Sequence, residues 1–136
     1  YLWYELLISK STEPADQLLY SDMCLAWAET CEARSPQQTA YQELMGRALW
    51  RRGLRAPGTE GVPYFENALQ HYKMAAEMYP VRAEFWDEYA NRCTLLADRF
   101  TALGLNEKAQ HLVTESERVK QIAAGLREAW AQTKPV

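Results

Sequence analysis

The segment PYFENALQHYKMAAEMYP, residues 63–80, decides the fold class. Its apolar residues recur every three or four positions, which places them on one broad face of an α-helix. Proline fits the first turn of a helix and breaks its interior, so we expect Pro63 to open this helix and Pro80 to end it. The apolar face consists of Tyr64, Phe65, Ala68, Leu69, Tyr72, Ala75, Ala76 and Tyr79.

Helical spacing also continues on both sides of this segment, and no stretch alternates with period two for long enough to predict a strand. Residues 55–61 are rich in Gly and Pro, which indicates a loop. The sequence therefore predicts an all-α protein of antiparallel helical hairpins joined by short turns. Besides residues 63–79, the expected helices are the end of one at 1–9, then 14–34, 35–53 beginning at Ser35-Pro36, 81–103 closed by Gly104, and 106–131.

The helices carry an internal repeat. Ala68-Leu69, Tyr72, Ala75-Ala76 and Pro80 resemble the second half of a tetratricopeptide repeat (TPR), and Met45-Gly46, Ala48 and Gly53 resemble its first half. Phe85-Trp86, Tyr89-Ala90, Gly104 and Ala109 resemble the repeat that follows.

The resemblance implies one TPR-like domain, residues 1–136, in which hairpins stack as a short right-handed superhelix. Its approximate units are 1–38, 39–82 and 83–120, with a C-terminal capping helix in the extension 121–136. The middle unit exceeds the usual repeat length of about 34 residues, and the loop at 55–61 supplies the excess. We expect this loop to be dispensable. We expect helix-packing positions at Ala48, Ala68, Ala75 and Ala90.

Composition and charge exclude several functions. The net charge of −3 gives no electrostatic reason to bind nucleic acid. The apolar stretch at residues 2–8 is too short to span a bilayer, so we expect no direct membrane insertion of this segment.

The sequence predicts no catalytic residue, no cofactor and no metal site. There is no nucleophile elbow or phosphate-binding loop, and His71 and His111 have no ligand at metal spacing. Cys24 and Cys31 lie about 10 Å apart on one helix, too far for a disulfide. Free cysteines favour a reducing, cytoplasmic compartment.

The resemblance also suggests where a protein or peptide partner binds, because the first helix of each TPR lines a concave groove. By register, the middle unit contributes Glu43, Leu44, Arg47, Trp50 and Arg51, and the third contributes Glu84, Asp87, Glu88 and Asn91. Trp50 is either an anchor for the partner or a buried residue at a repeat junction. The acidic residues either bind the partner or serve the helix dipole. The third unit lacks the Lys, Asn and Arg set with which some family members hold a chaperone's C-terminal carboxylate.

A different function also remains open. Tyr79-Pro80 followed by Arg82-Ala83 resembles helical-repeat tails of bacterial cell-surface polysaccharide polymerases and ligases. The chain begins at Tyr1 and not at Met, so we expect a larger parent protein. In this alternative the domain is an extracytoplasmic appendage of a membrane-anchored parent chain.

Overall fold

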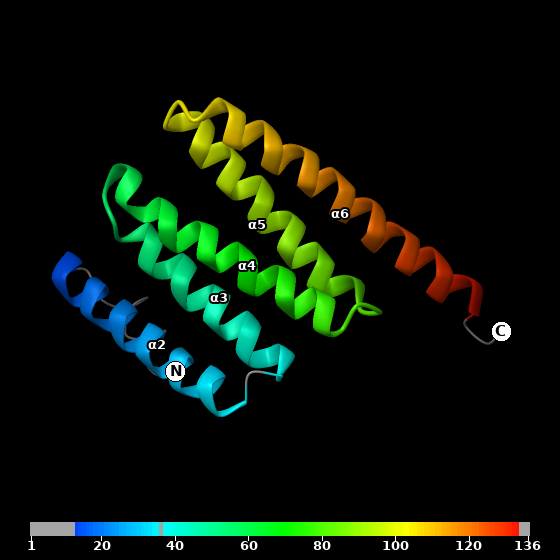
Figure 1. Cartoon of the computed structure of the whole chain (residues 1–136), viewed down its shortest axis with the longest axis horizontal. Helices are drawn as coiled ribbons and strands as arrows, with labels where there is room; N and C mark the ends of the chain where they lie inside the picture. The colour runs from blue at the N-terminus through cyan, green and yellow to red at the C-terminus, as the bar shows by residue number, and fades with distance from the viewer. Residues whose placement is uncertain (1–12, 36, 134–136) are drawn as a thin grey trace. The chain divides into compact units, whose positions relative to one another are not determined.

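The computed structural model describes residues 13–35 and 37–133, and within them every regular element is a helix (Figure 1). The all-α prediction is confirmed for this part of the chain. The helix end expected at residues 1–9 lies outside it. The elements are α2 (Pro14–Arg34), α3 (Thr39–Leu54), the 3₁₀ helix η1 (Gly58–Gly61), α4 (Val62–Met78), α5 (Ala83–Ala102) and α6 (Asn106–Thr133).

Two helix starts differ from the expectation. Ser35 does not begin a helix; its backbone N–H closes α2 by donating to the carbonyl of Cys31 at 3.1 Å, and α3 begins only at Thr39. The start of α5 at Ala83 is two residues later than expected. A turn from Tyr79 to Arg82, in which the Arg82 N–H donates to the Tyr79 carbonyl, occupies the intervening residues.

The chain divides into two compact units, with the boundary between His71 and Tyr72 inside α4. In the first unit α2 packs along α3. Cys24 and Ala28 are buried on α2, and Asp22 pairs with Arg52 of α3 at 2.8 Å. All three cysteines are free thiols.

The connection from α3 to α4 is packed in part: residues 57–60 are exposed, and the dispensability of the loop stays a prediction. Ala56 and Gly61 are buried. A Cβ on Gly61 would lie 2.5 Å from the Gly53 carbonyl oxygen and 3.1 Å from the ring of Phe65. The two glycines therefore allow the end of α3 and the start of α4 to meet around that ring.

In the second unit α5 and α6 form an antiparallel hairpin, seen side by side in Figure 1. The Ser116 hydroxyl reaches across to the carbonyl of Ala90 at 3.1 Å and to the Thr94 hydroxyl at 2.8 Å. Small side chains permit this close approach. The buried residues of the two helices include Ala90, Cys93, Ala97, Ala109, Ser116, Val119 and Ala123.

The four alanines expected at packing positions, Ala48, Ala68, Ala75 and Ala90, are all buried, as predicted. The right-handed superhelix and the division into repeats stay predictions. None of the described helices combines the length and the hydrophobicity that a bilayer span requires.

Candidate partner-binding site

The predicted groove residues of the middle unit all lie on α3. Glu43, Leu44, Arg47 and Arg51 are half-buried, and Arg47 pairs with Glu43 one turn away at 3.4 Å. Trp50 is only 7% exposed and packs edge-on against Phe65, with ring centroids 4.8 Å apart. Its indole is therefore part of the core of the first unit, which is the second of the two roles that the sequence left open.

The predicted residues of the third unit lie on α5, and each carboxylate among them has a partner within the second unit. Arg82 pairs with Glu84 at 3.4 Å, Arg92 with Glu88 at 2.9 Å, and Arg127 with Asp87 through both guanidinium nitrogens. Asn91 is exposed. The α3 and α5 sets belong to different units, so a groove between them stays a prediction.

A cleft of about 490 Å³ lies within the second unit, at the open end of the α5–α6 hairpin. Its size is in the range of natural ligand sites. The turn before α5, the first residues of α5 and the last turns of α6 provide its walls. The lining residues are Tyr79, Val81, Arg82, Ala83, Glu84, Leu126, Arg127 and Trp130.

The wall formed by the turn is held by the first turn of α5. The indole Nε1 of Trp86, a buried residue, donates to the carbonyl oxygen of Pro80 at 2.9 Å. The rings of Tyr79 and Phe85 meet edge-on at 6.3 Å, and the guanidinium of Arg82 lies over the Phe85 ring. These contacts fix the backbone of the wall before any partner binds.

The opposite wall comes from α6, which has 28 residues against 20 in α5. Because the helices are antiparallel and connected at the other end, the last turns of α6 extend beyond the first residue of α5. Leu126 and Trp130 are one turn apart there and lie on the same face. Trp130 is 70% exposed and Val81, on the turn, is 69% exposed.

Among the described residues that line the cleft, the charged ones are Arg82, Arg127 and Glu84. The pKa of Glu84 lies below its ordinary value, first because its carboxylate bonds to its own backbone N–H at the start of α5, and further because Arg82 and Arg127 are close. These contacts favour the charged form of the Glu84 carboxylate at the edge of the cleft.

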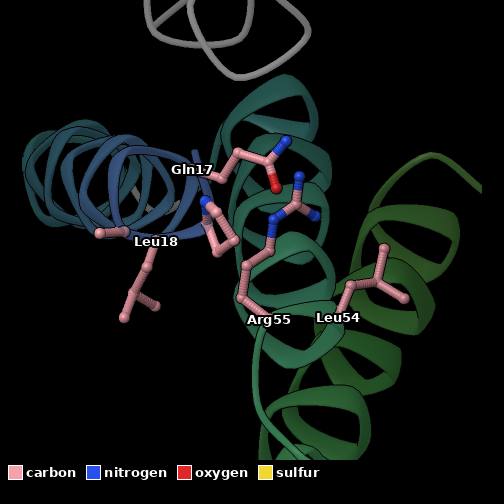
Figure 2. Close-up of a pocket in the computed structure, with 6 residues that line it drawn as sticks. Gln17, Leu18, Leu54 and Arg55 are labelled. Carbon is pink, nitrogen blue, oxygen red and sulfur yellow. The ribbon is translucent and has the colours of Figure 1, made fainter. Parts of the chain in front are cut away.

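A second cleft, of about 570 Å³, lies in the first unit between the start of α2 and the end of α3. Figure 2 shows the side chains of Gln17 and Arg55 extending toward one another there. The described residues of its lining include Leu18 and Leu54, and none of these described residues is aromatic. Aromatic residues and arginine are the side chains that most often dominate binding energy, so the hairpin cleft is the better candidate.

The buried polar groups between α5 and α6 have structural partners. The Tyr89 hydroxyl donates to Glu115 at 2.8 Å, and Glu115 also pairs with Arg118 at 2.6 Å. Burial raises the pKa of the nearby Cys93 thiol to about 11, so this thiol stays protonated at neutral pH. Within the described residues, no three His, Cys, Asp or Glu side chains are grouped as metal ligands.

Sequence reasoning assigned the extension 121–136 only to capping and missed the cleft. One signal was present: the helical pattern from Asn106 continues further than the pattern of the helix before it, and its excess carries Leu126 and Trp130. The turn wall could not be inferred, because it depends on the Trp86–Pro80 hydrogen bond.

No family model matches the chain, and no curated protein and no solved structure shows significant similarity to it. The TPR resemblance and the cell-surface alternative therefore both stay predictions.

Proposed function

We propose that this chain is a protein-interaction module that holds a segment of its partner in the cleft at the end of the α5–α6 hairpin. The observation that carries the proposal is Trp130. Its indole is 70% exposed and lies on the wall of a cleft whose opposite wall is already fixed. Contact between the apolar surface of a tryptophan and water is unfavourable, and burial of that surface by a partner is a common source of binding energy.

The apolar surface around Trp130 supports the same function. Tyr79 and Val81 are exposed across the cleft, and Leu126 lies one helical turn from Trp130. A contiguous exposed apolar surface with charged residues at its edge is typical of a site that another molecule covers. Little reorganisation is needed because the turn is held by Trp86, so less of the binding energy is lost to ordering the site.

Selection from a random peptide display library against the 136-residue chain tests the proposal. Affinities of the selected peptides are then measured by fluorescence polarisation for the parent chain and for Trp130→Ala. Truncation of a true anchor costs about 2 kcal/mol or more, which weakens binding roughly thirtyfold.

The matched control is Val113→Ala, which removes an exposed apolar side chain from α6 outside the cleft. We expect this variant to keep the parent affinity. Undiminished binding to Trp130→Ala, or a selection that yields no binding peptide, contradicts the proposed function.

A further inference from the structure

The cleft combines an apolar surface with two arginines, which differ in how firmly their present carboxylate partners hold them. Arg127 makes two contacts with Asp87, which hold its guanidinium against α5. Arg82 pairs with Glu84 through a single nitrogen at 3.4 Å, where the two side chains are 55% and 70% exposed, and its guanidinium also lies over the Phe85 ring. An exposed pair of this kind contributes little, so its arginine exchanges partners at small cost.

From this geometry, and resting on the proposed function, we infer that the cleft is specific for a short acidic–apolar peptide segment, in which Asp or Glu adjoins an aliphatic or aromatic side chain. The apolar side chain lies between Trp130 and Val81. The neighbouring carboxylate accepts hydrogen bonds from Arg82, which leaves Glu84, while Arg127 remains with Asp87 and adds its positive charge.

Charge complementarity favours this occupant over a basic one. A lysine or arginine beside the anchoring side chain would meet two guanidinium groups at the rim, and among the described residues that line the cleft only Glu84 carries a carboxylate. Arg82 already holds one carboxylate, that of Glu84, at 3.4 Å, and the start of α5 and both arginines lower the pKa of this group. Charges at the rim of an interface mainly determine specificity and the salt dependence of binding.

The test starts from the peptide whose binding depends most on Trp130. Three versions are synthesised, with Asp, Ser or Lys at the positions that flank its apolar anchor, and their affinities for the parent chain are measured by fluorescence polarisation. We expect the Asp version to bind about fivefold more tightly than the Lys version, which is the scale of one exposed ion pair. This preference should shrink on going from about 10 mM to about 0.5 M NaCl because of screening.

The variant Arg82→Glu should reverse the order of the Asp and Lys versions. Its control is Lys120→Glu, which makes the same sign change on α6 at a pair with Glu117 that is also exposed and lies outside the cleft. We expect the control to keep the parent order within about twofold, a difference smaller than one exposed ion pair contributes.

The outcomes separate the two proposals. Equal affinities of the three versions, or a preference for the Lys version, overturn the specificity for acidic segments. The proposed function stands in that case as long as peptide binding still depends on Trp130. An unchanged order in Arg82→Glu overturns the role of Arg82 in the same way. If none of the selected peptides depends on Trp130 for binding, both proposals are overturned.

Discussion

The indole nitrogen of Trp86 donates a hydrogen bond of 2.9 Å to the carbonyl oxygen of Pro80, so a buried side chain of α5 fixes the turn that forms one wall of the cleft. We expect Trp86→Phe to lower the free energy of unfolding by about 1–3 kcal/mol, from the lost hydrogen bond and the smaller ring. Urea denaturation followed by circular dichroism measures this change.

Trp130→Phe is the matched control for Trp86→Phe. The same substitution at a side chain that is 70% exposed should change the free energy of unfolding by less than about 0.5 kcal/mol. Equal losses in the two variants would mean that the Trp86 contact does not stabilise the turn. Peptide affinity should fall in Trp86→Phe as well, because the wall is no longer held in place.

The two glycines Gly61 and Gly125 should respond to the same substitution with opposite signs. A Cβ on Gly61 meets the Gly53 carbonyl oxygen at 2.5 Å, so Gly61→Ala should destabilise by about 1–3 kcal/mol. A Cβ on Gly125 meets nothing within 4 Å, so Gly125→Ala should stabilise α6 by about 0.5–1 kcal/mol.

Thermal melting of the two variants beside the parent chain checks both signs. A higher melting temperature for Gly61→Ala would show that the α3–α4 connection is packed more loosely than the close approach of Gly53 and Gly61 indicates. A lower one for Gly125→Ala would show that another element contacts this face of α6.

The helices could be predicted from local signals in the sequence, whereas the candidate site could not. Apolar spacing and the prolines placed α4 nearly correctly, because both act within a few residues. Trp50 could not be assigned from the sequence, since a tryptophan at a helix-face position serves a groove or a core equally well. Its contact with Phe65 decides the matter, and that contact depends on the close approach of Gly53 and Gly61.

The protein should lose stability as the pH falls below about 6.5, the ordinary pKa of histidine, because of His71. Burial lowers the pKa of His71, and this effect exceeds the opposite one of the Glu32 charge. The folded state therefore disfavours the protonated ring. Below about pH 6.5 the unfolded state binds more protons than the folded state, so the free energy of unfolding decreases as the pH is lowered. The Nδ1 atom of His71 lies 2.7 Å from the amide oxygen of Gln42.

Urea titrations between about pH 5 and pH 8 measure this dependence, within the range where histidine changes charge. The slope should flatten in His71→Gln and persist in His111→Gln, whose side chain is exposed on α6. An identical slope in His71→Gln would assign the pH dependence to other groups.

The close approach of α5 and α6 at Ala90 should make that position intolerant of a larger side chain. Ala90 is 2% exposed, and its carbonyl accepts a hydrogen bond from the Ser116 hydroxyl of α6. Ala90→Leu has to separate the helices or distort rotamers, at a cost of about 1–3 kcal/mol. Ala124→Leu makes the same change on the exposed face of α6 and should be nearly neutral.

Because separated helices also displace α6 from the turn, Ala90→Leu should weaken peptide binding, and Ala124→Leu should not. Equal melting temperatures for the two variants would mean that the hairpin is packed more loosely than the Ala90–Ser116 contact indicates.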